Sequence, residues 1–380
     1  MFVSADSFTG TASRRLLREP SRLFPADIRH WSSVRHAVIV RDLMRFARRL
    51  LALLVTVALL GLIGYTTFGV VVASDLYVHP AESTVCQTPL GRYGWTYEAI
   101  NYDIADDANL RANPNMERCV NQGSTAGADV VTTDGVPIAG WYVPPAHADE
   151  ASAPTIVLIH GWGANKSEVL KYAVPFHDRF AVVAIDLRNG GRSGKAETTW
   201  GLREQLDVRA ILDWLERTKH PSHIVVMGNS MGGGTAVIEA ATDPRVEALI
   251  LDSTHARVAD PLARRLLVEE GQPVSVPGTP AILAGAWLRT GLNFTDADPV
   301  KFIPALGDRP LLIIHGTDDV IDLPARSAEV NLAAAQKAGV PVELQMCQGG
   351  EHGSLVDVGC PTDWATWSVS FVDRVFGLAR

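Results

Sequence analysis

Residues 223–238 read His-Ile-Val-Val-Met-Gly-Asn-Ser-Met-Gly-Gly-Gly-Thr-Ala-Val-Ile, and this stretch decides the fold. A short apolar stretch leads directly into a G-x-S-x-G pentapeptide centred on Ser230, and a helical pattern begins immediately after the serine. The pentapeptide alone is a weak signal, because glycine and serine are common. A strand-turn-helix context is more specific, since it delivers the serine to a strained turn beside a helix N-terminus. The stretch therefore predicts a nucleophilic serine at the edge of a sheet.

The order of the remaining polar motifs fits a serine nucleophile of this kind, which is followed first by an acid and then by a histidine. Residues 311–321 read Leu-Leu-Ile-Ile-His-Gly-Thr-Asp-Asp-Val-Ile, an apolar strand that ends in a turn with two carboxylates, Asp318 and Asp319. His352 lies in a glycine-flanked loop and is the only histidine after His315. We predict that Ser230, His352 and one of these aspartates act together. Asp252, which ends an earlier strand, is the alternative acid.

A further turn supplies candidate groups for binding an oxyanion. Residues 154–163 read Pro-Thr-Ile-Val-Leu-Ile-His-Gly-Trp-Gly, an apolar strand that ends in a glycine-flanked turn. One backbone N–H is expected from this turn and one from the residue after the serine. We predict that the amides of Trp162 and Met231 hold the oxyanion, and that His160 has a structural hydrogen-bonding role.

Five motifs follow one another in an order that resembles the α/β-hydrolase superfamily: HGWG (160–163), DLRNGGRSG (186–194), GNSMGG (228–233), HGTDD (315–319) and GGEHG (349–353). The motifs and their order are most similar to those of its serine-aminopeptidase-like, monoacylglycerol-lipase-like and dienelactone-hydrolase-like branches, over about residues 129–380. The resemblance implies a serine hydrolase that needs no cofactor or metal. It also places the acid four residues after the histidine of the HG turn, which favours Asp319, although the doubled aspartate leaves Asp318 open. Asp186 and Arg188 match a turn common in this superfamily, where a structural ion pair is expected.

The pattern beyond residue 128 predicts an α/β fold with a mostly parallel sheet covered by helices on both faces. We expect a hairpin at 128–143, and strands near 155–160, 180–186, 223–228, 246–251, 310–315 and 341–347. A small helical cap is predicted at about 254–303. Its apolar residues could line an acyl pocket or, as we favour for most of them, form the cap's own core: Leu266, Leu267, Ile282, Leu283, Trp287, Leu288 and Phe294.

Residues 50–73 form an uncharged, mostly apolar run of 24 residues, which spans about 36 Å as a helix against a hydrocarbon core of about 30 Å. Residues 1–49 hold ten arginines and four acidic residues. The positive-inside rule therefore predicts a cytoplasmic tail (1–49), a transmembrane signal anchor (50–73), an extracytoplasmic lead segment (74–127) and an extracytoplasmic hydrolase domain (128–380). A cleaved signal is the alternative, because Arg48-Arg49-Leu-Leu and the small residue Ala73 faintly resemble one.

All four cysteines follow the apolar run, which suggests two disulfides on an exported domain. Three pairings are possible, and proximity in sequence favours Cys86–Cys119 and Cys347–Cys360.

Several function classes are disfavoured. No CxxC or clustered His/Cys spacing indicates a metal site. The glycines near residues 190 and 233 fail the nucleotide- and dinucleotide-binding patterns. The chain has a net charge of −8 although residues 1–49 are basic, so the portion after the apolar run is acidic, which argues against nucleic-acid binding. We expect hydrolysis of carboxylic esters or thioesters of a small-molecule or lipid-like acyl substrate. A serine peptidase or an acyltransferase is the alternative enzyme, and a catalytically inactive membrane-tethered scaffold is the alternative of another class.

Overall fold

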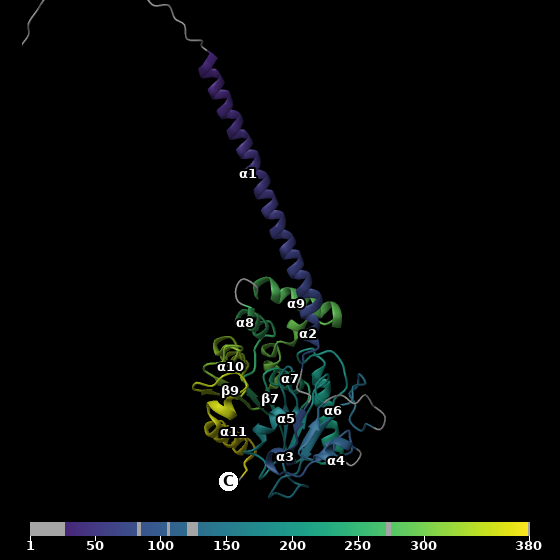
Figure 1. Cartoon of the computed structure of the whole chain (residues 1–380). Coiled ribbons are helices and arrows are strands. Elements are labelled where there is room, and N and C mark those ends of the chain that lie inside the picture. The colour runs from purple at the N-terminus through teal and green to yellow at the C-terminus, as the bar shows by residue number, and fades with distance from the viewer. Residues whose placement is uncertain (1–26, 82–84, 105–106, 120–127, 271–274, 379–380) are drawn as a thin grey trace, which may run out of the picture. The chain divides into compact units, whose positions relative to one another are not determined.

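The computed structural model describes residues 27–81, 85–104, 107–119, 128–270 and 275–378 (Figure 1). The chain divides into two units, Met1–Leu62 and Ile63–Arg380. The described part of the first unit is helical and belongs to α1 (Asp27–Phe68), whose last turns lie in the second unit. By length and composition, the helix from Arg35 to Val78 can cross a membrane. The side chains of its apolar window are exposed, unlike those of a buried core helix.

An eight-stranded sheet organises the second unit, in the order β10-β9-β8-β7-β5-β6-β4-β2. The six parallel strands are β5 (Thr155–Ile159), β6 (Ala181–Ile185), β7 (Ile224–Asn229), β8 (Ala248–Asp252), β9 (Leu311–Gly316) and β10 (Val342–Cys347). β4 (Gly140–Val143) and β2 (Glu98–Ile100) continue the sheet in antiparallel pairing. The predicted fold class, a mostly parallel sheet with helices, is confirmed.

Two apolar cores cover the two faces of the sheet. Alternate residues of each buried strand enter opposite cores, as Val157 and Leu158 do on β5. One core includes residues of α6 (Glu204–Thr218), α7 (Met231–Ala240) and α10 (Ala328–Ala338). The other includes residues of the 3-10 helix η2 (Leu170–Ala173), which continues α5 (Lys166–Val169), and of α11 (Pro361–Phe376). Burial on both faces explains why these strands read as continuous apolar runs.

The region before β5 differs from the expected hairpin. Residues 128–143 form one isolated bridge, between Val131 and Pro137, and β4 pairs with β6 and β2. The lead segment therefore contributes an edge strand, β2, to the sheet. It also forms a two-stranded sheet from β1 (Val85–Gln87) and β3 (Met116–Arg118), with the short helices α3 (Pro89–Tyr93) and α4 (Ala108–Ala112).

The cap insertion contains α8 (Ala259–Glu270) and α9 (Ser275–Thr290), followed by three 3-10 turns, η3 (Phe294–Ala297), η4 (Pro299–Lys301) and η5 (Ile303–Leu306). Pro280 lies inside α9. Within the second unit, α9 packs against the π-helical turn η1 (Gly69–Ala73) and α2 (Ser74–Val78), which continue α1 without a break (Figure 1).

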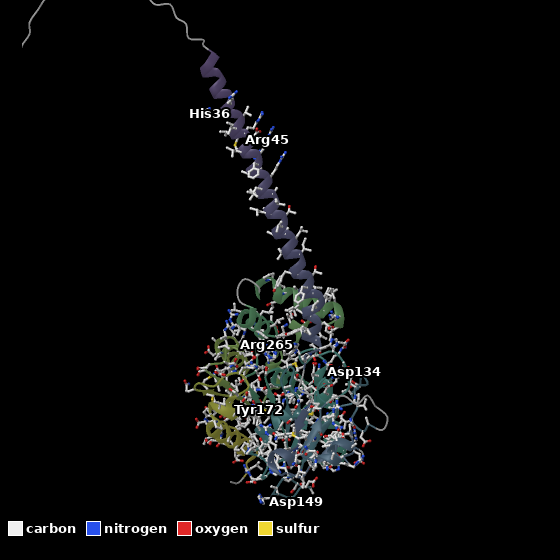
Figure 2. The ribbon with its side chains drawn as sticks, in the orientation of Figure 1. His36, Arg45, Asp134, Asp149, Tyr172 and Arg265 are labelled. Atoms are coloured by element: carbon white, nitrogen blue, oxygen red, sulfur yellow. A yellow bond between two sulfur atoms is a disulfide. The ribbon has the colours of Figure 1, made fainter. Side chains whose placement is uncertain are left out.

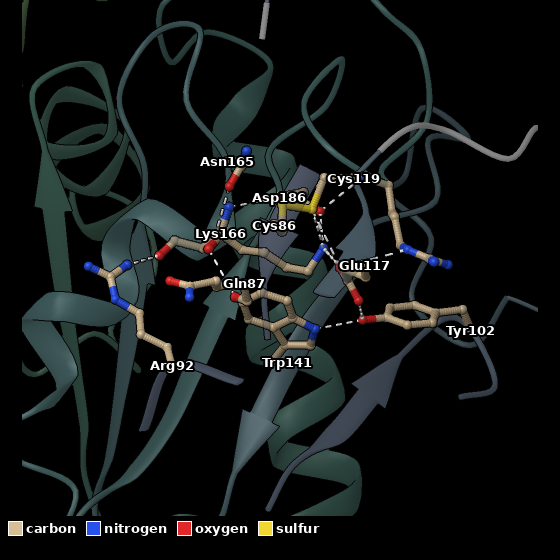
Figure 3. The surroundings of a disulfide bond; sticks show 12 residues. Cys86, Gln87, Arg92, Tyr102, Glu117, Cys119, Trp141, Asn165, Lys166 and Asp186 are labelled. Carbon is tan, nitrogen blue, oxygen red and sulfur yellow. Dashed lines mark hydrogen bonds and ion pairs between the residues drawn. A yellow bond between two sulfur atoms is a disulfide. The ribbon is translucent and has the colours of Figure 1, made fainter. Parts of the chain in front are cut away.

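Two disulfides are present, Cys86–Cys119 and Cys347–Cys360, with Cα–Cα distances of 5.7 and 5.8 Å. Beside the first lies the fully buried ammonium of Lys166, which is 2.7 Å from Glu117 and 2.6 Å from Asp186 (Figure 3). The expected structural ion pair of the 186–194 turn therefore has other partners. Asp186 pairs with Lys166, whereas Arg188 pairs with Asp207 and Asp134.

Candidate active site

Ser230 occupies a strained turn between β7 and α7. Its φ of 53° and ψ of −119° are unusual for a residue with a side chain, and such strain is stored preferentially at functional sites. The turn is possible because the residues two positions before and after Ser230 are glycines. A Cβ on Gly228 would lie 2.3 Å from the carbonyl oxygen of Gly232, and a Cβ on Gly232 would lie 2.3 Å from that of Ile159. The G-x-S-x-G spacing is thus a packing requirement at the edge of the sheet.

His352 joins the serine to a carboxylate. Its Nε2 is 3.0 Å from Ser230 Oγ and its Nδ1 is 2.8 Å from Asp319 Oδ2. The three side chains come from the loops that follow β7, β9 and β10, whose carboxyl ends meet at one edge of the sheet. With Nδ1–H donating to Asp319, Nε2 is the basic nitrogen that faces the serine hydroxyl.

The buried carboxylate of Asp319 is held ionised. Its Oδ1 accepts hydrogen bonds from the backbone N–H groups of Ile321 (3.0 Å) and Asp322 (2.8 Å). Burial opposes ionisation, but hydrogen bonds and charges from His315 and His352 outweigh it and hold the pKa of Asp319 well below its usual range. A permanently charged carboxylate suits an acid that stabilises an imidazolium.

The two alternative acids are engaged elsewhere. Asp318 is exposed, and its Oδ1 accepts a hydrogen bond from the hydroxyl of Thr317. Asp252 is buried, and its two oxygens accept from Asn229 (2.9 Å) and from the indole of Trp364 (2.8 Å). Neither carboxylate has a hydrogen bond to His352 among the described residues.

Charge around His352 sets its protonation. Burial disfavours the imidazolium, but the hydrogen bond and negative charge of Asp319, with further charge from Asp322, raise the pKa of His352. The carboxyl group of Asp322 is 3.9 Å from His352 Nδ1. Its own burial raises the pKa of Asp322 to about 7, because attraction from His352 does not compensate for lost hydration.

Three polar residues near the site, His315, Lys171 and Asp322, were not predicted from the sequence as site residues. His315 also contacts Asp319, with Nε2 3.3 Å from Oδ2, and donates to the carbonyl oxygen of Asp322. Lys171, on η2, donates to the carbonyl oxygen of Gly353 at 2.7 Å and pairs with Asp357, so it ties the loop of His352 to the other side of the site. The HG motif could have drawn attention to His315, but no local pattern marks Lys171 or Asp322.

The loop that carries Trp162 lies against the serine. A Cβ on Gly161 would lie 3.3 Å from the Cβ of Ser230, and Met231 begins α7 directly after the serine. His160 holds the loop, with Nδ1 2.8 Å from the carbonyl oxygen of Gly161 and Nε2 accepting from the backbone N–H of Leu187 at 3.0 Å. Gly161 and the start of α7 therefore lie beside Ser230, and His160 has structural contacts.

A cavity of about 250 Å³ opens beside Ser230. Aromatic, cationic and aliphatic side chains line the cavity. Two of the lining residues, Tyr172 and Arg265, are labelled in Figure 2. The lining includes Tyr77, Trp162, Lys171, Tyr172, Trp200, Ser230, Pro261, Leu262, Arg265, Ile321 and His352.

The cap contributes to this lining through α8, with Pro261, Leu262 and Arg265. The seven apolar cap residues considered as an acyl pocket are not among the lining residues. Ile282 and Phe294 are buried in the core, Leu266 and Leu283 pack against it, Leu267 is half-buried, and Trp287 and Leu288 are exposed. The preference for a core role thus fits four of the seven.

One cluster of the described residues has the geometry of metal ligands, namely Cys86, Glu117 and Cys119. Its two sulfurs are joined in a disulfide, and Glu117 is ion-paired with Lys166. This donor set does not suit a resident metal, because thiolates rather than disulfides bind metals.

Comparison with known proteins identifies the fold. Residues 154–273 match the family model described as alpha/beta hydrolase fold. The chain is 31% identical over 106 residues to a probable 1-acylglycerol-3-phosphate O-acyltransferase of Oryza sativa subsp. japonica, covering 27% of this chain and 25% of that protein. It is 28% identical over 123 residues to 2-(acetamidomethylene)succinate hydrolase of Mesorhizobium japonicum, covering 29% of this chain and 43% of that protein. The matched region is less than half the length of either relative.

Solved structures resemble the chain over a larger share. An esterase from Pyrococcus furiosus superposes with a TM-score of 0.57 and 19% identity, covering 78% of this chain and 97% of that one. At this identity the likeness concerns the fold. Together with the matching family model and the sheet order, it shows that the chain has the α/β-hydrolase fold.

Proposed function

We propose that this protein is a membrane-anchored serine hydrolase that cleaves carboxylic ester or thioester bonds. The observation that carries the proposal is the chain of hydrogen-bond distances from Ser230 Oγ through His352 to Asp319, 3.0 and 2.8 Å long. A serine in a strained turn beside a histidine and a buried carboxylate is the arrangement that activates a hydroxyl for attack on a carbonyl.

In the proposed reaction, Ser230 Oγ attacks the carbonyl carbon as His352 Nε2 takes its proton. Asp319 keeps the Nδ1–H tautomer and stabilises the imidazolium. The amides of Trp162 and Met231 hold the negative oxygen, and each such donor is worth about 10²–10³ in turnover. The imidazolium then protonates the leaving alcohol or thiol. Water, deprotonated by His352, attacks the acyl-enzyme and releases the carboxylic acid and free Ser230.

An acyltransferase is the second candidate, because a matched relative bears the name of a 1-acylglycerol-3-phosphate O-acyltransferase. The same acyl-enzyme would then be attacked by an alcohol instead of water. The difference lies in which acceptor reaches the acyl-enzyme, so the products of the reaction distinguish the two activities.

We propose a single membrane pass with the N-terminus in the cytoplasm and the catalytic unit outside. The uncharged run from Leu50 to Ala73 supplies the length. Arg45, Arg48 and Arg49 on its N-terminal side favour a cytoplasmic tail, and disulfides after the span favour an oxidising compartment.

Fluorophosphonate labelling of the full chain in membranes tests the proposal. We expect labelling of the native protein and of Ser152→Ala, an exposed control serine, and loss of labelling in Ser230→Ala. Full labelling of Ser230→Ala would refute the assignment, and no labelling of the native protein would favour an inactive scaffold. A panel of acyl esters, with and without 1-acylglycerol-3-phosphate as acceptor, then separates hydrolysis from acyl transfer.

A further inference from the structure

One face of helix α9 is exposed and carries no charge. Pro280, Ala284, Trp287 and Leu288 recur at the spacing of one helical face, and we call them the α9 apolar face. Trp287 is 53% exposed and Leu288 66% exposed. A helix that borders water normally presents polar or charged side chains outward. This face is therefore poorly suited to water, and a single tryptophan beside leucine is typical of a membrane interface.

The opposite face of α9 packs closely on the end of the apolar helix through small residues. A Cβ on Gly278 would lie 2.5 Å from the hydroxyl of Tyr65, and a Cβ on Gly285 would lie 2.2 Å from the carbonyl oxygen of Val70. Gly69 and Ala281 meet between these two points. Small residues allow two helical backbones to approach in this way, as in helix pairs within membranes. α9 is thus fixed alongside residues 65–74.

The uncharged stretch of the N-terminal helix and the uncharged stretch of α9 end side by side. No charged residue occurs from Leu50 to Ser74, and Asp75 is the first. In α9 no charged residue occurs from Ser275 to Leu288, and Arg289 is the first. Arg289 Nη1 lies 3.1 Å from Asp75 Oδ1, and Arg289 Nε donates to Ser74 Oγ at 3.1 Å. Both uncharged stretches therefore end at one ion pair.

The length of the apolar run places this ion pair at the membrane surface. About 20 helical residues cross a hydrocarbon core of about 30 Å, so a span that begins at Leu50 reaches the far edge near Gly69. η1 and α2, which begin at Gly69 and Ser74, pack on α9 at and beyond this edge. Val71 and Leu76 are also exposed there, at 54% and 60%, and extend the apolar surface.

We propose that α9 is a second membrane-contacting element, whose apolar face lies in the interfacial layer of the bilayer that the N-terminal helix crosses. The proposal rests on the membrane anchoring proposed above. It has a consequence for substrate, because α8, which packs on α9, supplies Pro261, Leu262 and Arg265 to the cavity beside Ser230. A cap that rests on the bilayer would deliver lipid-like esters from the membrane to the serine.

Fluorescence quenching by lipid tests the contact directly. The full chain carrying Ser230→Ala is reconstituted in phosphatidylcholine vesicles, with or without bromine on the acyl chains. We compare this protein with versions that also carry Trp287→Phe or Trp367→Phe, a half-buried tryptophan of α11. We expect the brominated lipid to quench less emission in the Trp287→Phe protein, while Trp367→Phe leaves the quenched emission unchanged.

Equal lipid quenching with and without Trp287 would overturn the proposal. So would quenching of Trp287 by aqueous acrylamide alone, which indicates a face in water, or shielding from both quenchers, which indicates a second protein copy. Failure of the full chain to associate with vesicles would overturn the anchoring as well. Because the serine is absent from these proteins, lipid quenching of Trp287 stands even if no hydrolase activity is found.

A kinetic comparison tests the consequence for substrate. Leu288→Asp places a charge on the α9 apolar face, and we expect turnover of an ester embedded in vesicles to fall by about fivefold or more. Turnover of a short water-soluble ester should remain within about twofold, because Leu288 does not line the cavity. Val174→Asp, at another exposed apolar residue, is the matched control and should change neither rate. Equal rates of Leu288→Asp and native protein on embedded ester would contradict delivery through the cap.

Discussion

The indole Nε1 of Trp162 donates a hydrogen bond of 2.9 Å to the backbone carbonyl oxygen of Tyr77, 85 residues earlier in the chain. Tyr77 also lines the cavity and stacks on Trp200 at a centroid distance of 5.2 Å. The segment that leaves the apolar helix thus forms a wall of the candidate site and orients the loop whose amide is proposed to hold the oxyanion.

Loss of this hydrogen bond should reduce turnover more than stability. Trp162→Phe keeps most of the ring packing but removes the donor, so the loop can shift, and a displacement of about 1 Å can cost on the order of 10²-fold in rate. We expect kcat on a soluble ester to fall by about 10-fold to 10²-fold, with a small change in Tm. Trp367→Phe is the control. An unchanged kcat in Trp162→Phe would show that the loop is held without this contact.

The choice of acid is tested by paired substitutions. Asp319→Asn should lower kcat by about 10⁴-fold, because an amide favours the wrong histidine tautomer. Asp318→Asn should have little effect, because the side chain of Asp318 is exposed and contacts Thr317. Steady-state kinetics on the same ester measure both. The reverse result would move the acid to Asp318, and loss of activity in neither variant would direct attention to Asp252.

The pH dependence of kcat/KM should report His352. The imidazole must be neutral to accept the proton of Ser230, so activity falls as the pH drops through the pKa of His352. Asp319 raises this pKa above the ordinary value of 6.5, and Asp322 contributes in the same direction. We expect an acid limb with a midpoint above about 6.5 and a plateau at higher pH.

Asp322→Asn removes one of the charges that raise the pKa, so the midpoint of the acid limb should shift to lower pH while the plateau changes little. Profiles between about pH 5 and pH 9 on a soluble ester measure the shift. A midpoint that does not move would show that Asp322 is uncharged across the acid limb.

The disulfide Cys347–Cys360 brackets His352, with a sequence separation of 13 residues. Closing a loop of this size is worth about 3 kcal/mol in the chain-entropy model. A Cβ on Gly350 would lie 2.9 Å from Cys347 Sγ, so the loop of His352 folds tightly on the sulfur. We expect the Cys347→Ala/Cys360→Ala protein to lose turnover at temperatures well below its Tm. The Cys86→Ala/Cys119→Ala protein is the comparison, and an equal loss in both would indicate general destabilisation.

The buried ammonium of Lys166 should be important for stability. Lys166→Met leaves the buried Asp186 without its cation and leaves Glu117 with Arg192, 3.7 Å away, and breaking such a buried pair costs about 3–5 kcal/mol. Lys219→Met, which removes contacts with the more exposed Glu98 and Glu150, should cost about 0–1 kcal/mol. Denaturant unfolding measures both. A similar small loss for the two variants would contradict the importance of the buried cluster.

Local patterns in the sequence determined the main features of the fold. The apolar runs that became β5 to β10, the G-x-S-x-G turn and the order of Ser230, Asp319 and His352 could all be read directly. This is possible because a strand buried on both faces, a glycine turn and a helix start are each specified within about ten residues. The pairing of the cysteines also followed from their spacing.

Only the tertiary structure decided which distant residues meet. It made Glu98–Ile100 an edge strand, brought Tyr77 to the cavity and His315 to Asp319, and left Asp318 exposed while Asp319 contacts His352. It also left Trp287 and Leu288 exposed rather than in the cap's core. These outcomes depend on the packing of segments tens of residues apart, where the geometry of the whole unit, and no local periodicity, selects the neighbours of each side chain.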